Sequence, residues 1–214
     1  MASRRALSIA AALLTVTICA PVARAQEHTP GPTWSQEDTV RIVKDVQHKL
    51  NRLTNYAVFD WLTFGIQGKT IILRGYASRP SLKQDAGRVV KNIAGVEKVD
   101  NEIEVLPNSP NDDRIRAAVY NRVYTASSLR MYNANAGSLG RGLSVARMAG
   151  GITNDPPIGF HAIHIIVKNG HVTLYGVVNN ENDAAIAGMQ ANSAPGAFSV
   201  DNQLLVPGAR GKEK

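Results

Sequence analysis

An internal repeat is the strongest constraint that this sequence places on its fold. When Gly75 is set on Gly176, an offset of 101 residues, two stretches match without a gap from about residue 57 to residue 105. The tripeptide Val99-Asp100-Asn101 falls on Val200-Asp201-Asn202. Apolar positions coincide as well: Phe59 with Phe160, Leu62 with Ile163, Phe64 with Ile165, Ile66 with Val167, Ile71 with Val172 and Leu73 with Leu174. Such a match at one fixed period indicates that a structural unit has been duplicated.

Each unit is predicted to contain a β-hairpin. In the first unit, apolar residues recur at the period of two that a half-buried strand requires: Leu62, Phe64 and Ile66. A turn follows at residues 67–69 and again at 168–170, where Asn-Gly is a strong hairpin signal. Each second strand ends in a glycine, Gly75 or Gly176, which we expect where the chain bends or another backbone approaches.

Helices are predicted on both sides of each hairpin. A helix of about residues 81–93, and its counterpart at 182–193, follow the hairpins and end at glycines. Ser35 is expected to cap the leading helix of the first unit, which presents Val43, Val46, Leu50 and Leu53. Asn111 or Asp112 is expected to cap the second leading helix, which presents Ile115, Ala118, Val119 and Val123. With a short third strand, each unit has the order α-β-β-α-β.

This order, present twice, resembles tandem BON domains (the bacterial OsmY and nodulation family). The residues that carry the resemblance are 68–75 and 169–176, each a small turn followed by a strand that ends in glycine, then a helix, a glycine and the Val-Asp-Asn tripeptide. The resemblance covers residues 36–107 and 111–207. It implies an α+β fold of two sandwiches and a non-enzymatic envelope protein linked to osmotic or envelope stress, for which phospholipid-surface binding is the leading proposal.

The domain boundaries follow from the repeat and from the ends of the chain. We predict a linker at 26–34, a first domain at 35–107, a second at 110–207 and a tail at 208–214, with Pro107 and Pro110 interrupting any continuous element at the junction. The first 25 residues resemble an export signal, because a basic and then apolar stretch ends in Ala23-Arg24-Ala25. Sec and twin-arginine export both remain open. Lipidation is disfavoured because Ile18 precedes Cys19.

Export and cysteine content together indicate the compartment. Cys19 is the only cysteine, so cleavage after Ala25 leaves a mature chain that has no disulfide, no thiol nucleophile and no cysteine-bound metal. An exported protein without cysteines suits a bacterial periplasm.

The two units differ by an insertion that coincides with an excess of positive charge. The second unit carries 26 extra residues within about residues 126–157, which indicates either function or disorder. Residues 114–154 have a formal charge of +6, with no Asp, Glu or Lys. Three of the six tyrosines lie there too. Arginine pairs with phosphate and tyrosine tolerates a lipid headgroup region, so this mixture suits an anionic membrane surface.

The predicted phospholipid-binding residues come from this segment. Arg116, Tyr120 and Tyr124 follow the i, i+4, i+8 spacing of one helical stripe. The full set is Arg116, Tyr120, Arg122, Tyr124, Arg130, Tyr132, Arg141 and Arg147. The competing interpretation is structural: arginines often form a solvated face, the tyrosines can edge the core, and the glycine-rich stretch 137–151 can be a loop without a partner.

Enzymatic chemistry finds little support in the sequence. No H-E-x-x-H, G-x-S-x-G or P-loop pattern occurs, and His161 and His164 are spaced to face opposite sides of a strand. We therefore expect no enzyme activity, no cofactor, no metal, no small-molecule substrate and, given export, no nucleic-acid partner. The expected partner is an anionic phospholipid surface, and possible envelope proteins form the alternative, in which the chain is a periplasmic adaptor or chaperone-like module.

The face of each sheet that is directed away from the helices raises that alternative. Phe59 and Trp61, with Phe160 and Ile166 in the second unit, are predicted to point away from the helices. We expect the two units to pack against one another through these faces. Otherwise the faces form a patch for an envelope protein.

Overall fold

The computed structural model describes residues 33–133, 152–157 and 159–208. These residues all belong to one compact body, which contains both repeats. The predicted export signal at 1–25 lies outside the described residues. Two α-β-β-α-β units follow one another along the chain, and the mixed α/β fold with two sheets confirms the predicted fold class.

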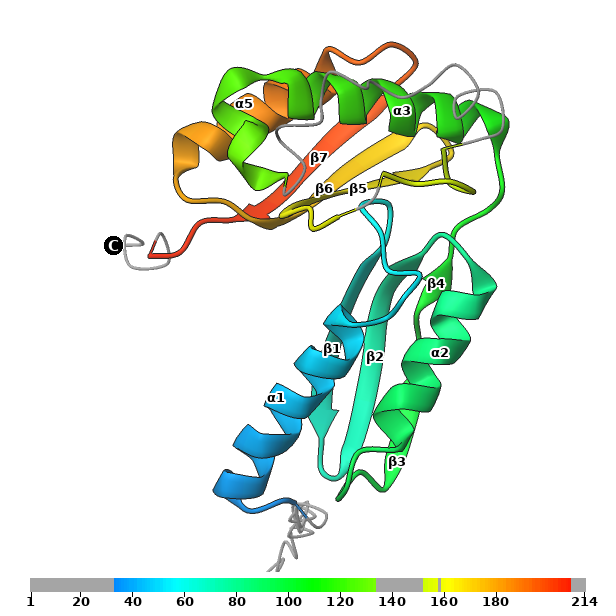
Figure 1. Ribbon diagram of the computed structural model, residues 1–214, viewed down its shortest axis with the longest axis vertical. Helices are drawn as coiled ribbons and strands as arrows, with labels where there is room; N and C mark the ends of the chain where they lie inside the picture. The colour runs from blue at the N-terminus through cyan, green and yellow to red at the C-terminus, as the bar shows by residue number, and fades with distance from the viewer. Residues whose placement is uncertain (1–32, 134–151, 158, 209–214) are drawn as a thin grey trace, which may run out of the picture. The chain divides into compact units, whose positions relative to one another are not determined.

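The first unit is a sheet with two helices on one face (Figure 1). Its elements are α1 (Gln36–Asn51), β1 (Trp61–Gln67), β2 (Thr70–Ala77), α2 (Pro80–Lys91), β3 (Lys98–Asn101) and β4 (Glu104–Val105). β1 pairs antiparallel with β2, and β3 and β4 pair parallel with the other side of β2. The core lies between the sheet and the helices, and it includes Ile42, Ile71, Leu73 and Leu82, all fully buried.

The second unit repeats this arrangement (Figure 1). Its elements are α3 (Pro110–Thr125), the 3₁₀ helix η1 (Ser127–Tyr132), β5 (Ile163–Lys168), β6 (His171–Val177), α5 (Glu181–Asn192) and β7 (Ser199–Leu205). β6 pairs antiparallel with β5 and parallel with β7. The insertion therefore lies between α3 and β5 and begins with η1.

The glycine at the end of each hairpin is required by a close backbone approach. Gly75 and Gly176 have φ of 112° and 133°. A Cβ would lie 2.0 Å from the Trp61 carbonyl oxygen at the first position and 1.9 Å from that of Ala162 at the second. No side chain fits there, which confirms the sequence-based expectation for these glycines.

The repeated asparagine has a matching structural role in both units. Asn101 donates from its side-chain amide to the carbonyl of Lys83 in α2, and Asn202 donates to that of Ala184 in α5, each at 2.8 Å. A Cβ on Gly87 would lie 2.8 Å from the Asn101 amide nitrogen. The third strand and second helix of each unit are thus joined by the same polar contact, which accounts for the asparagine of the repeated tripeptide.

Two helix predictions need correction. Ser35 caps α1 as predicted, but the buried face consists of Ile42, Val46 and Leu50, because Val43 lies one residue off that face. The cap of α3 is Ser109, whose hydroxyl accepts from the Asp112 amide, rather than Asn111 or Asp112. Asp112 instead accepts from the backbone amides of Asn169 and Gly170, both at 2.9 Å, and so holds the β5–β6 turn.

The units contact each other through a segment that crosses from the first into the second. Val58 and Phe59, which precede β1, are fully buried in a core whose other members come from the second unit. Trp61 stacks on Tyr175 with ring centroids 5.4 Å apart. The expected packing between units therefore involves Trp61 as predicted. Phe160, by contrast, is 72% exposed, and that part of the prediction is wrong.

Candidate functional site

Four of the eight predicted phospholipid-binding residues lie in the interior. Arg116 is 1% exposed, and Tyr120, Tyr124 and Tyr132 are also buried. A buried side chain cannot contact a membrane surface, so the prediction that these four residues bind phospholipid is wrong. Arg122 and Arg130 are exposed, whereas Arg141 and Arg147 lie outside the described residues.

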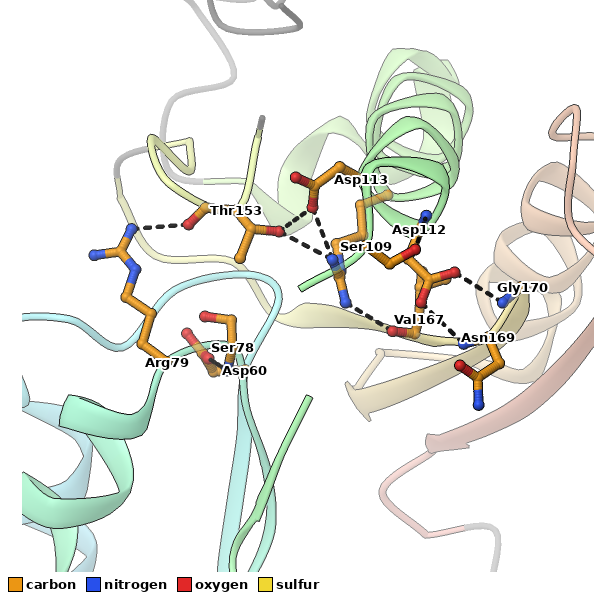
Figure 2. Close-up of polar contacts among 11 residues, drawn as sticks. Asp60, Ser78, Arg79, Ser109, Asp112, Asp113, Thr153, Val167, Asn169 and Gly170 are labelled. Carbon is orange, nitrogen blue, oxygen red and sulfur yellow. Dashed lines mark hydrogen bonds and ion pairs between the residues drawn. The ribbon is translucent and has the colours of Figure 1, made fainter. Parts of the chain in front are cut away.

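The buried guanidinium of Arg116 holds α3, β5 and the end of the insertion together. Figure 2 labels its partners Asp113, Thr153 and Val167. The guanidinium donates to the Asp113 carboxylate at 2.7 Å, the Thr153 hydroxyl at 3.0 Å and the Val167 carbonyl at 2.7 Å. Thr153 also hydrogen-bonds Asp113. Arg79, at the start of α2, donates to the carbonyls of Thr153 and Asn154 at 2.8 and 2.9 Å. The returning end of the insertion is therefore bonded to both units.

The three tyrosine hydroxyls are used inside the second unit. Tyr124 donates to the Ile163 carbonyl at 2.6 Å, and burial raises the pKa of this phenol above its usual range. Tyr132 donates to Asp183 at 2.6 Å and accepts from the Asn179 amide at 2.8 Å. Buried hydroxyls must find such partners, so these residues stabilise the fold.

An exposed basic groove remains on the opposite side of α3. It has a volume of about 740 Å³, and Arg114 and Arg122 line it on either side of Ala118. Eight residues of helix place the two arginines about 12 Å apart along the axis. The described residues that line it are Asn111, Arg114, Ile115, Ala118, Asn121, Arg122, Thr125, Pro195 and Gly196. We call this the α3 groove. None of the described residues that line it is acidic.

The groove arginines have no carboxylate partner among the described residues. Arg114 and Arg122 are exposed on the solvent side of α3, and Arg130 on η1 is exposed as well. Sequence reasoning counted Arg114 in the charge but omitted it from the site. The sequence signal for Arg114 was its spacing from Arg122. Arg114, Ala118 and Arg122 are four residues apart in turn, so all three lie on one face of the helix.

An exposed aromatic ring lies near the start of α3 and was also missed. Phe198 is 75% exposed, and its ring lies over Gly170, where an added Cβ would come within 2.6 Å. That glycine belongs to the turn held by Asp112 of α3. At the matching position of the first unit, Glu97 forms an ion pair with Lys69 at 2.8 Å. The sequence signal for this site was that the repeat aligns the aromatic Phe198 with the charged Glu97.

Comparison with known families agrees with this repeated architecture. The family model described as BON domain matches twice, at residues 65–107 and 149–208. The chain is a tandem BON domain protein. Both matches contain the hairpin glycine, the helix and the Val-Asp-Asn strand that the geometry explains.

Other comparisons add little to the assignment of this BON domain protein. A search of curated proteins finds no match. Among solved structures, the chain is similar to CdsD, a structural protein of the type III secretion system of Chlamydia trachomatis, at 13% identity and a TM-score of 0.25, covering 78% of this chain and 92% of that one. The C-terminal domain of CdsD gives 16% identity, a TM-score of 0.25, and coverage of 81% and 99%. Scores this low support no inference.

BON domain proteins are typically periplasmic or envelope-associated and generally non-enzymatic. Within the described ranges, no helix combines the length and apolar character needed to cross a membrane. The same residues contain no cluster of three or more His, Cys, Asp or Glu side chains arranged for a metal ion.

Two histidines of this BON domain protein, His161 and His164, are buried among aromatic rings. His161 packs on Tyr120 and Tyr124, and His164 packs on Tyr56 and Trp61, with ring centroids 5.2–5.6 Å apart. Burial lowers the pKa of each imidazole to about 4. These contacts give both histidines a structural role in the packing.

We expect the free energy of unfolding to fall as the pH drops from about 6.5 to about 4. In that window the unfolded chain binds protons at His161 and His164 but the folded chain does not, so acid favours unfolding, by on the order of a few kcal/mol. Burial raises the pKa of Asp60, which offsets part of the loss. Denaturant unfolding at several pH values measures the slope. His164→Gln should flatten it and His171→Gln, at an exposed site, should not; equal slopes in all three proteins would contradict this assignment.

Proposed function

We propose that this BON domain protein is a non-enzymatic periplasmic protein, exported and cleaved after Ala25, that binds anionic phospholipid surfaces peripherally and serves in envelope or osmotic stress protection. The observation that supports the proposal best is the α3 groove, where Arg114 and Arg122 are exposed and no acidic residue belongs to the described part of the lining. Arginine suits this role because its planar guanidinium is weakly hydrated and binds phosphate through two hydrogen bonds.

The rest of the surface near α3 fits the same partner. Phe198 offers an exposed apolar ring that can enter the headgroup region, and Arg130 adds a further charge on η1. Each basic residue near an anionic bilayer contributes about 1 kcal/mol, and salt screens this attraction. Arg141 and Arg147 belong to the same proposal from the sequence. Binding of this kind is reversible and does not anchor the protein permanently.

Vesicle flotation tests the proposal directly. The protein should float with anionic vesicles at low salt, lose binding as salt rises, and stay unbound with neutral vesicles. Arg114→Ala combined with Arg122→Ala should weaken binding more than tenfold, because about 2 kcal/mol is lost. The matched control is Lys44→Ala combined with Lys49→Ala, which removes two exposed charges from α1.

The control decides between a site and general electrostatics. If both double variants weaken binding equally, the α3 groove is not the site. If the protein does not float under any condition, lipid binding is excluded and the alternative of a periplasmic adaptor or chaperone-like module takes its place. Protein binding through apolar sheet faces should resist salt, whereas lipid binding should not.

A further inference from the structure

The outer edge of the second sheet is closed by groups of the same chain. The two-residue turn at Asn169 and Gly170 makes Lys168 and His171 a hydrogen-bonded pair, so alternate residues of β5 turn their backbone groups outward. Those outward groups have partners. The Ile163 carbonyl accepts from Tyr124, the Ile165 amide donates to the Val58 carbonyl at 2.8 Å, and the Val167 carbonyl accepts from Arg116.

The matching edge of the first sheet is open. β1 is the edge strand (Figure 1) and pairs only with β2 in the part of the chain that the structure describes. By the same turn geometry, Phe64 and Ile66 turn their backbone groups outward. No described residue hydrogen-bonds those groups outside the β1–β2 pairing.

The side chains on this edge are also less covered than their repeat partners. Ile165 and Val167 of β5 are fully buried. Phe64 is only partly buried and Ile66 is 38% exposed. In the second unit, Arg116 and Tyr124 of α3 close the edge. On β1, Tyr56 hydrogen-bonds the backbone of Leu62, but no described residue makes such a contact with Phe64 or Ile66.

β1 differs from the remaining sheet edges because it carries no charged residue. Exposed strand edges normally carry charged residues that prevent pairing with other chains. β3 has Lys98 and Asp100, β4 has Glu104, and β7 has Asp201. β1, with the sequence Trp-Leu-Thr-Phe-Gly-Ile-Gln, has neither charge nor proline over seven residues.

We propose that β1 is an interface through which a second copy of this chain pairs antiparallel, with a two-fold axis at Gly65. This register pairs Phe64 with Ile66 of the copy, so that the open backbone groups satisfy one another and two partly exposed apolar side chains meet. It also sets polar Thr63 against polar Gln67. The strand is thus complementary to itself, as a two-fold interface requires.

Gly65 fits the position on the axis. Its pair is one without mutual hydrogen bonds, where the opposing Cα atoms approach to about 4.5 Å. A Cβ added to Gly65 would meet no atom within 4 Å, so the side of the sheet on which it lies is unobstructed. The dimer carries two α3 grooves, which raises its avidity for any surface that the groove binds.

Analytical ultracentrifugation over a range of concentrations tests the dimer. The wild-type protein should sediment as a reversible dimer, and Ile66→Lys should raise the dissociation constant by about tenfold or more. The control is Val40→Lys, which makes the same change at a residue of α1 that is 51% exposed and outside the strand. A monomer at every concentration, or equal weakening by both variants, overturns the proposal.

Disulfide trapping tests the register independently of any effect of Ile66→Lys on folding. In a Cys19→Ser background, which removes the only native cysteine, Gly65→Cys should form a cross-linked dimer on mild oxidation. Thr63→Cys, on the same exposed side, should not, because its copies lie about four residues, or 13 Å, apart along the strands. Cross-linking of both variants alike, or of neither, overturns the two-fold pairing at Gly65.

Discussion

Phe59→Ala will lower the free energy of unfolding of the protein by about 3–5 kcal/mol. Phe59 belongs by sequence to the first unit, yet it is fully buried among side chains of the second. Its ring centroid lies 6.4 Å from that of Tyr120. Removing it leaves a cavity where α3 and β5 enclose the ring. The loss should appear in denaturant unfolding. Spectroscopic probes in the second unit should report unfolding at a lower denaturant concentration than probes in the first unit.

The repeat supplies a matched control for this prediction. Phe160 occupies the same position in the second unit but is 72% exposed, so Phe160→Ala should change the free energy of unfolding by no more than about 0.5 kcal/mol. Equal effects from the two variants would show that Phe59 is not a core residue of the second unit. The expected difference also implies that the second unit is incomplete without residues 58–59.

Much of the fold could be predicted because the repeat made each signal appear twice. The hairpin glycines, Asn169-Gly170 and the Val-Asp-Asn tripeptide all reflect local backbone needs: positive φ, close approach, or one amide contact. Such requirements depend on few neighbours, and a sequence displays them directly. The crossing of Val58 and Phe59 into the second core depends on distant partners, so periodicity could not reveal it.

The candidate site was harder to predict because periodicity does not show how wide the buried face of a helix is. On α1 one stripe is buried, but α3 buries two, since β5 and residues near the end of the insertion contact a second side through Arg116 and Tyr124. The stripe with Arg116 and Tyr124 therefore became interior. Charge counting treats every arginine as solvated, and it cannot find the carboxylate and the carbonyl that make burial tolerable.

Arg116→Met will cost about 3–5 kcal/mol of stability, because it leaves the Asp113 carboxylate buried without its cation. Asp113 is 9% exposed, and its remaining partner is the Thr153 hydroxyl. The Val167 carbonyl also loses its donor. Chemical unfolding measures the change. The control, Arg122→Met on the exposed side of the same helix, should stay within about 0.5 kcal/mol of the wild-type protein.

Asp113→Leu combined with Arg116→Met separates the ion pair from the space that it fills. Replacing both partners with apolar side chains removes the unpaired charge, so the double variant should recover most of the stability that Arg116→Met loses. A double variant as unstable as the single one would mean that the hydrogen bonds to Thr153 and Val167, rather than the charge, hold this region.

Wherever Arg116→Met remains folded, it should still float with anionic vesicles, whereas the double variant at Arg114 and Arg122 should not, because only the latter two arginines face solvent.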